Sequence, residues 1–144
     1  MNKTLFFEIN NYILGIKLNE INEVLENKNI QPIPLAPPFV VGVLPRRGKF
    51  LTIINLLAHP LKDISPDARI LVLEHKEIDI GILVSKIRQV ISTPITLPAN
   101  QNTGFPLIHN DEKKCLCHHL IRMEEGIPFL DLEKLFTYLK KVWF

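Results

Sequence analysis

The chain has 144 residues, of which 47% are hydrophobic and 22% are charged. This balance is typical of a folded globular protein and excludes a disordered chain, and the length allows one domain to bury about two-thirds of its unfolded surface. Seventeen Lys and Arg against fifteen Asp and Glu leave a formal charge of +2, which is too small to indicate the basic field of a nucleic-acid-binding protein.

The sequence predicts neither a membrane span nor an export signal. Its longest apolar run, residues 39–44, is far shorter than the roughly 20 residues that cross a bilayer. The apolar run near the N-terminus is interrupted by Glu8, so it does not match the core of a signal peptide. We therefore expect a cytoplasmic protein, in which Cys115 and Cys117 are poorly placed for a mutual disulfide and stay reduced.

The first part of the chain is predicted to form three strands. Residues 5–9 and 12–18 are apolar runs that flank Asn10-Asn11, and asparagine tolerates the positive φ angles of a tight hairpin. A third strand over residues 21–25 continues as an extended segment to residues 30–34, where two prolines remove backbone donors. This strand should therefore end at the edge of a sheet.

Further strands follow, with one short helical turn before them. Proline at the start and glycine at the end favour that turn over residues 37–42. Three hairpins are predicted from paired apolar runs with turn residues between them, and their strands are residues 42–46 and 49–55 around Arg47-Gly48, 70–74 and 79–84 around 75–78, and 116–123 and 127–130 around 124–126. Residues 87–91 form another strand, and residues 93–110, with three prolines, predict a long polar loop.

One amphipathic helix is predicted at the end of the chain. Asp131 suits its N-cap, and lysines favour its outer face and carboxyl end. Its apolar residues recur at spacings of three and four: Leu132, Leu135, Phe136 and Leu139. About nine short strands and a single terminal helix predict an all-β protein of small closed barrels, in one domain over residues 1–144.

Several blocks of residues are more specific than a fold class. In the first half they are Gly15-Ile16-x-Leu18-x-x-Ile21-x-Glu23-Val24, Ile33-Pro34-x-Ala36-Pro37-x-x-Val40-x-Gly42-Val43-x-x-Arg46-Arg47-Gly48-Lys49 and Ile53-Ile54-Asn55-Leu56. In the second half they are Ile70-Leu71-Val72-Leu73-Glu74, Gly81-Ile82-Leu83-Val84-x-x-Ile87-x-x-Val90 and Pro128-Phe129-Leu130-Asp131-Leu132-x-Lys134-Leu135-Phe136. In this order and spacing, and over nearly the whole chain, the sequence resembles the CheW-like domain family.

The resemblance implies a fold and a function. The fold would be two intertwined five-stranded barrels of the SH3-like type. The function would be that of a non-catalytic adaptor, without a cofactor, that couples chemoreceptors to a CheA-type histidine kinase at membrane receptor arrays. Its partners would be the regulatory domain of the kinase and the cytoplasmic tip of a methyl-accepting chemoreceptor, with no nucleic acid and no membrane insertion. An alternative is a CheW-like adaptor of a pilus-motility or other non-flagellar pathway.

Three positions depart from the pattern of the family. Its usual Asn-Leu-Arg-Gly turn is Pro45-Arg46-Arg47-Gly48 here, its frequent Asp-Leu is Asn55-Leu56, and its frequent Val-Asp pair is Val84-Ser85. Charge is therefore lost at two of these places. We interpret a changed surface on an intact core as a sign of a changed partner.

By resemblance, partner binding involves an acidic strand residue and the arginine turn. We expect Glu23 and Arg47 to pair across the sheet in bidentate fashion, which would fix the turn against the strand. Arg46, Gly42 and Gly48 are included in this site. Two separate solvated charges are the alternative for the pair, and a conformational requirement is the alternative for the glycines.

Apolar strand residues are expected to line a groove between the barrels, which would accept the amphipathic helical tip of a receptor. These residues are Ile21, Val24, Leu83, Val84, Ile87 and Val90. The alternative for each of them is a place in the core, because apolar strand residues are usually buried.

The segment that holds both cysteines is a candidate for a metal or catalytic site. His109, His118 and His119 lie near Cys115 and Cys117 in sequence. On a strand, however, the outer residues of the alternating set would be about 13 Å apart, too far for one zinc ion. No nucleophile elbow, zinc-protease helix or phosphate-binding glycine loop is present, so neither a metal nor an enzymatic activity is predicted.

A nucleic-acid-binding small barrel is the alternative from a different functional class. Arg46, Arg47 and Lys49 would form its basic tip, with Phe50 available for stacking on a base. Three cations are weak evidence for a nucleic-acid-binding surface, so contact with a protein is the preferred interpretation.

Overall fold

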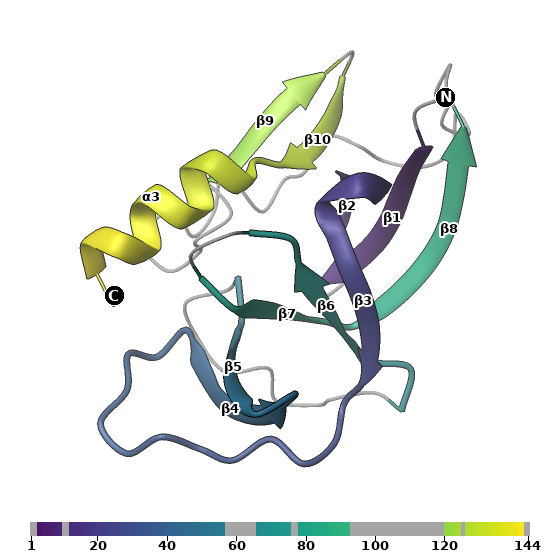
Figure 1. Cartoon of the computed structure of the whole chain (residues 1–144). Helices are drawn as coiled ribbons and strands as arrows, with labels where there is room; N and C mark the ends of the chain where they lie inside the picture. Colours follow the sequence, from purple (N-terminus) through teal and green to yellow (C-terminus); the bar gives the residue numbers. More distant parts are fainter. Residues whose placement is uncertain are drawn as a thin grey trace.

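A computed structural model describes residues 3–9, 12–56, 66–75, 78–92, 120–124 and 126–142. These residues form ten strands, one 3₁₀ turn and one α-helix (Figure 1). The elements are β1 (Lys3–Ile9), β2 (Tyr12–Lys17), η1 (Leu18–Glu20), β3 (Ile21–Glu26), β4 (Val40–Arg46), β5 (Lys49–Ile54), β6 (Arg69–Leu73), β7 (Ile80–Val84), β8 (Lys86–Ser92), β9 (Ile121–Glu124), β10 (Ile127–Leu130) and α3 (Leu132–Val142). The predicted class, all-β with one C-terminal helix, is confirmed.

The strands form two five-stranded sheets that are nested along the chain. Sheet A has the order β8-β1-β2-β10-β9, and sheet B has the order β3-β6-β7-β5-β4. The chain leaves sheet A after β2, builds the whole of sheet B, and returns to sheet A at β8 (Figure 1). This is the intertwined arrangement that the sequence predicted.

The two sheets share one pairing pattern. In each, an antiparallel hairpin, β1–β2 or β6–β7, carries an edge strand on its first strand. The second strand of that hairpin then pairs in parallel with the last strand of another hairpin, β9–β10 or β4–β5. The same five-stranded unit is therefore built twice, once from the two ends of the chain and once from its middle.

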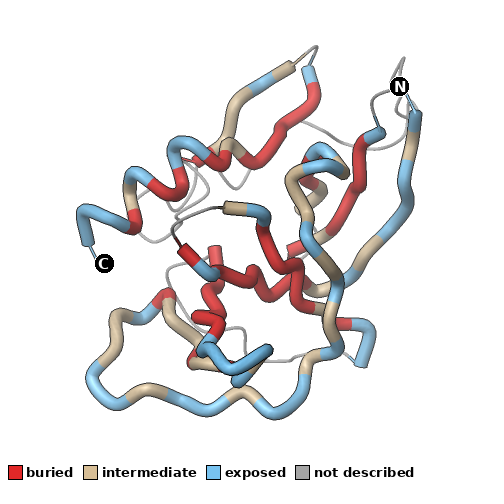
Figure 2. Tube along the Cα trace, in the orientation of Figure 1, coloured by how far each residue is buried: buried red, intermediate tan, exposed pale blue. Residues whose placement is uncertain are grey.

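One large apolar cluster joins the sheets. It combines Phe7 and Ile16 of sheet A with Leu71 and Ile82 of sheet B, all at most 1% exposed, and extends to the buried face of α3. Figure 2 shows the buried segments running along the strands of both sheets and along one side of the helix. Because one cluster is shared, burial of apolar surface holds the two units together.

The terminal helix forms as the sequence predicted. Asp131 caps it, since the Asp131 carboxylate accepts a hydrogen bond of 3.1 Å from the backbone N–H of Lys134. The predicted apolar face is buried at Leu132, Leu135, Phe136 and Leu139. Its lysines are exposed, and two of them lie in the last turn, where positive charge is favourable.

Two local predictions are wrong. Residues 37–42 form no helical turn, because the chain makes one β-turn, with a 2.9 Å bond from Val40 N–H to the Pro37 carbonyl, and β4 then runs through Gly42. The β-branched Val40 and Val41 favour the strand. β9 begins at Ile121, and Leu120, which was predicted to belong to this strand, is not part of it, while residues 116–119 lie outside the described ranges.

Two further predictions lie outside the described residues. These are the turn at residues 10–11 and the loop over residues 93–110.

Candidate functional site

The β4–β5 hairpin ends in an exposed, positively charged turn. Arg46 and Lys49 pair as the last residues of the ladder, so Arg47 and Gly48 alone form the turn. Their φ angles are 51° and 75°, as in the two-residue turns that match the twist of a hairpin. Glycine adopts such angles freely, and the turn presents the side chain of Arg47 to solvent.

Arg46, the residue before this turn, points back to the opposite edge of the same sheet. Its Nε donates a hydrogen bond to the carboxylate of Glu23 on β3, and its Nη2 donates to Oδ1 of Asn22 at 2.9 Å. The Nδ2 of Asn22 donates in turn to the carboxylate of Glu74, which follows β6. We call Asn22, Glu23, Arg46 and Glu74 the edge cluster.

The edge cluster lies where sheet B closes on itself. β3 and β4 are the two edge strands of this sheet, and the chain after β3 makes a further backbone bridge to β4. Gln31 and Val43 exchange two hydrogen bonds of 2.8 Å in this bridge. Side-chain and backbone bonds together therefore join two edges that would otherwise stay open.

Gly42 is required by this closure. A Cβ atom at position 42 would lie 2.3 Å from the carbonyl oxygen of Gln31. Because Gly42 is also buried, it serves the close approach of two backbone segments and is not available to a partner. Its predicted role as a contact residue is thereby corrected.

The two arginines of the turn have different roles. The side chain of Arg46 is 17% exposed and that of Arg47 is 71% exposed, while the side chain of Glu23 is 31% exposed. Arg47 comes within 3.8 Å of Glu23, so the expected pair exists as a long contact, but the hydrogen bond to Glu23 comes from Arg46. Arg46 therefore fixes the end of β4 to β3, and Arg47 projects from the turn into solvent.

The sequence held the signal for this difference. Side chains alternate along a strand, and Arg46 shares its face of β4 with the buried residues Leu44 and Gly42. The period of two therefore indicated that Arg46, and not Arg47, lies on the face that turns toward the barrel.

The residues expected to line a groove fall into three groups. Leu83 and Val84 are 1% and 0% exposed, because every side of β7 is covered, so their predicted contact with a partner is wrong and they belong to the core. Ile21 and Ile87 are half-buried and pack against the large apolar cluster. Of these six residues, only Val24 on β3 and Val90 on β8 are exposed, at 43% and 48%.

A small hollow lies beside the hairpin. It has a volume of about 210 Å³ and is lined by Arg46, Arg47, Lys49, Leu51 and Asp79. Three cations against one carboxylate make it a place where an acidic group of a partner would find complementary charge.

A second cavity lies where the two sheets meet, and sequence analysis missed it. It has a volume of about 280 Å³, and its lining includes Glu20 of η1, Glu74 and His75 after β6, and Arg122 and Asp131 beside β9 and β10. The Oε1 atom of Glu20 is buried without a hydrogen-bond partner. Burial raises the pKa of Glu20, and the nearby charge of Arg122 opposes that rise.

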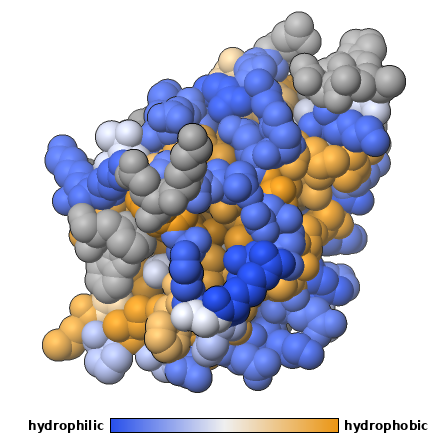
Figure 3. Space-filling model, in the orientation of Figure 1, coloured by the Kyte–Doolittle hydropathy of each residue, from blue (hydrophilic) through white to orange (hydrophobic). Residues whose placement is uncertain are grey.

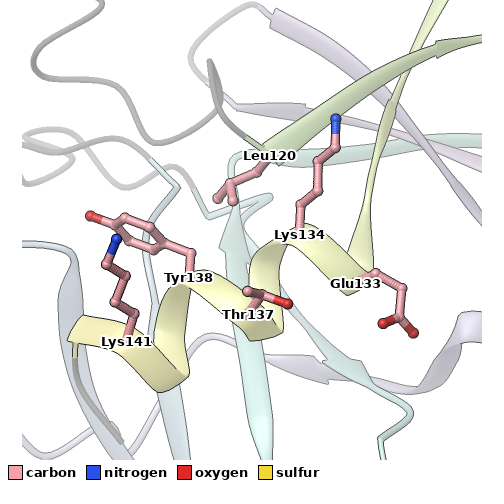
Figure 4. Close-up of a pocket in the computed structure, with 6 residues that line it drawn as sticks. All are labelled: Leu120, Glu133, Lys134, Thr137, Tyr138 and Lys141. Carbon is pink, nitrogen blue, oxygen red and sulfur yellow. The ribbon is translucent and has the colours of Figure 1, made fainter.

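A third hollow lies on the outer side of α3 (Figure 4). It has a volume of about 530 Å³ and is lined by Leu120, Glu133, Lys134, Thr137, Tyr138 and Lys141. In Figure 4 the hydroxyl of Tyr138 and the ammonium of Lys141 lie at one end and the ammonium of Lys134 at the other, while Glu133 points away from Leu120.

The described residues were predicted to hold neither a metal site nor a membrane span. Within the described ranges, no group of three His, Cys, Asp or Glu could hold a metal ion. The cysteine and histidine segment at residues 109–119 lies outside the described ranges, so that hypothesis is not addressed. Across the described part of the chain, no helix combines the length and apolarity that crossing a membrane requires.

Comparison with known proteins agrees with this architecture. The model of the CheW-like domain family matches residues 3–140. A chemotaxis protein CheW of Thermotoga maritima is 31% identical over 93 residues, which cover 62% of this chain and 60% of that protein. A chemotaxis protein CheW of Treponema pallidum is 25% identical over 142 residues, which cover 91% of this chain and 79% of that protein.

A solved structure shares the fold. The crystal structure of the scaffolding protein TtCheW from Thermoanaerobacter tengcongensis superposes with a TM-score of 0.62 at 21% identity, covering 90% of this chain and 82% of that one. The family match spans nearly the whole chain, and the nested pair of five-stranded sheets agrees with it. The chain therefore belongs to the CheW-like domain family, as its residue blocks predicted.

Proposed function

We propose that this chain is a non-catalytic scaffold of a chemotaxis-type pathway, acting in the cytoplasm to couple a chemoreceptor to a CheA-type histidine kinase. Family membership supports this proposal, as do relatives that are named as chemotaxis proteins. The matched region spans 60% of the Thermotoga protein, so the partners are proposed and not transferred.

The observation that carries the proposal is the difference between Arg46 and Arg47 at the β4–β5 turn. Arg46 is held by the edge cluster and fixes the turn, which leaves the exposed Arg47 on a rigid support. A charged group on such a support meets a partner without first losing conformational freedom. We place the contact with an acidic partner surface here, with Arg47, Lys49 and the hollow beside them.

The apolar part of the site is proposed on β3 and β8. Val24 follows Glu23 on β3 and is exposed, and Val90 is exposed on β8. Ile21 and Ile87, on the same two strands, are half-buried. These residues fit the apolar face of an amphipathic helix, which is the form that we propose for the receptor tip, while the kinase would dock through its regulatory domain.

Two variants of this chain separate a binding role from a structural one. Arg47→Ala removes an exposed guanidinium, so we expect the fold to be unchanged and the binding of a receptor tip or kinase regulatory domain to weaken by about tenfold. Titration calorimetry with each purified partner gives the affinity, and thermal unfolding gives the stability.

The matched control is Lys28→Ala, which removes an exposed cation on the chain after β3 and should leave affinity unchanged. If Arg47→Ala binds both partners as tightly as the parent chain, the turn is not the contact. If neither partner binds the parent chain, the coupling role itself is wrong.

The nucleic-acid alternative has a separate readout. Arg46 is engaged by Glu23 and Asn22, which reduces the basic tip to Arg47 and Lys49 beside Phe50, itself 65% exposed. We expect no shift of a labelled oligonucleotide at physiological salt. A shift that Arg47→Ala abolishes would support nucleic-acid binding instead.

A further inference from the structure

The two arginines of the β4–β5 hairpin face the same carboxylate oxygen. Arg46 is hydrogen-bonded to Oε1 of Glu23, and Nη2 of Arg47 lies 3.8 Å from that same atom, which is beyond hydrogen-bond distance. Figure 3 shows a strongly hydrophilic patch in the lower centre of the molecule, where this hairpin approaches β3. Whether Arg47 stays exposed to a partner therefore depends on which arginine holds the oxygen.

Asn22 gives Arg46 a second bond. Its Oδ1 accepts a hydrogen bond of 2.9 Å from Nη2 of Arg46, and its Nδ2 donates to the carboxylate of Glu74. An amide carries an acceptor and donors together, so it can join a cation to an anion, which neither an ionised aspartate nor a lysine can do. The bond to Glu74 thereby keeps the amide oxygen of Asn22 turned toward the guanidinium.

An irregularity of β3 makes this arrangement possible. Successive side chains of a regular strand point to opposite faces, so Asn22 and Glu23 would not both reach one guanidinium. The pairing of β3 with β6, however, passes from Ile21 opposite Leu73 directly to Glu23 opposite Val72. Asn22 is therefore the extra residue of a β-bulge, a feature that re-aims side chains and is frequent beside functional sites.

We propose that Asn22 is a positioning residue, which keeps Arg47 free for a partner by holding Arg46 on Glu23. In its absence Arg46 would keep only its bond to Glu23, and Arg47 would compete for the same oxygen. A guanidinium that is paired with Glu23 has to give up that pair before it meets an acidic group of a partner, which lowers affinity. The role of Asn22 in binding rests on the proposed function, in which Arg47 is the contact.

NMR of the arginine Nε–Hε groups tests the competition on the chain alone. Rotation about the Nε–Cζ bond is slow in a guanidinium that is held by hydrogen bonds and fast in a free one. In the parent chain the rotation should be slower for Arg46 than for Arg47, and Asn22→Ala should speed it for Arg46 and slow it for Arg47. If both rates stay as in the parent, the proposal is overturned, with or without a partner.

Titration calorimetry with the kinase regulatory domain gives the consequence for binding. Asn22→Ala should bind about threefold more weakly than the parent, because the bonds that it removes are exposed to solvent. In the Arg47→Ala background the same change should have no further effect, since the positioned contact is gone. A merely structural role of Asn22 would lower affinity equally in both backgrounds, and that result would overturn the proposal.

The double variant Asn22→Ala with Glu23→Gln is the rescue. It removes the charge that captures Arg47, so its affinity should rise above that of Asn22→Ala alone, and a further fall would contradict the competition. The matched control is Asn19→Ala, which removes an exposed asparagine of η1 outside the edge cluster and should change neither readout. If Arg47→Ala binds as tightly as the parent, the proposed function fails, and the rotation rates still accept or reject the competition for Glu23.

Discussion

Sheets A and B are the same five-stranded unit, but they treat their edges differently. Sheet B closes on itself, because the chain after β3 bonds to β4 through Gln31 and Val43, and Arg46 reaches across to Glu23. In sheet A the corresponding hairpin is β9–β10, and its arginine, Arg122, makes contacts near its own strand pair.

The contacts of Arg122 show the contrast. Arg122 pairs with Glu124 on its own strand at 2.5 Å, lies 4.0 Å from Asp131 at the helix cap, and has its guanidinium 5.5 Å from the ring centre of Phe129. It therefore ties the hairpin to α3 and not to an opposite edge. Among the described residues, the two hairpin arginines therefore differ in reach: Arg46 bonds to the opposite edge of sheet B, whereas Arg122 stays beside its own hairpin and the helix cap, and the bonds of Arg46 support the turn at Arg47.

The largest effect is expected where the closure of sheet B is tightest. Gly42→Ala would place a methyl group 2.3 Å from the Gln31 carbonyl oxygen, so one of the two backbone segments must move and the bridge breaks. We expect a loss of about 3 kcal/mol in the free energy of unfolding, measured by urea denaturation.

The matched variant in sheet A is Gly126→Ala. Gly126 has a φ of 77° and open space around its Cβ position, so only the conformational cost of about 1 kcal/mol should appear. Equal losses at the two positions would contradict the view that the close approach of Gly42 to the Gln31 carbonyl dominates the cost.

A smaller effect is expected from the side-chain part of the closure. Arg46→Ala removes the donors to Glu23 and Asn22 and leaves a half-buried carboxylate without its partner. We expect a loss of about 1–2 kcal/mol, because hydrogen bonds to charged groups exceed neutral ones in strength and the site is partly open to solvent.

Arg47→Ala is the internal control for this variant, since its 71% exposed side chain should change stability by less than about 0.5 kcal/mol. Chemical denaturation of both variants gives the comparison. If Arg47→Ala proves the more destabilising of the two, the assignment of Arg46 as the structural arginine is wrong.

The sequence predicted individual hairpins and the terminal helix better than it predicted the contacts between distant segments. Turn residues and short apolar runs located the hairpins β4–β5 and β6–β7, because those signals are local. The helix cap at Asp131 was likewise visible in a few adjacent residues. The turn at residues 37–42 was misread because proline and glycine have the same preferences at helix ends and in close backbone contacts, and only tertiary structure separates the two.

The residues of the candidate site were singled out by resemblance, their role in partner binding stays a prediction, and the structure changes how they are arranged. Resemblance singled out Glu23 and the arginine turn, and the structure brings them together. Which arginine bonds to Glu23 depends on the strand face, and the burial of Leu83 and Val84 depends on cover from both sides of β7. Glu20 carries no sequence motif, and its partly buried position arises because η1 lies at the crossing from one sheet to the other.

The smallest effect is expected at that crossing, where the two sheets meet. The backbone N–H of Glu74 donates a 2.9 Å bond to the carbonyl of Glu20, so η1 is fixed to the end of β6 while the Glu20 carboxylate is buried beside Arg122. Because burial raises the pKa of Glu20 in the folded state, the folded state binds the proton more tightly than the unfolded chain does.

The charged form of Glu20 thus lowers the free energy of unfolding above the raised pKa, and this penalty disappears as the pH falls through that pKa to the ordinary value of an unfolded glutamate. Glu20→Gln should stabilise the protein near pH 7 by less than the effects above and should leave its stability unchanged near pH 3, below both values. Melting temperatures across this range check the prediction, with Glu26→Gln, at a 68% exposed carboxylate outside the cavity and the edge cluster, as the control. If the melting temperature of Glu20→Gln changes with pH in parallel with that of the parent, the Glu20 carboxylate has the same pKa in the folded and unfolded states. Glu20, at the crossing between the two sheets, would then contribute no pH dependence to stability.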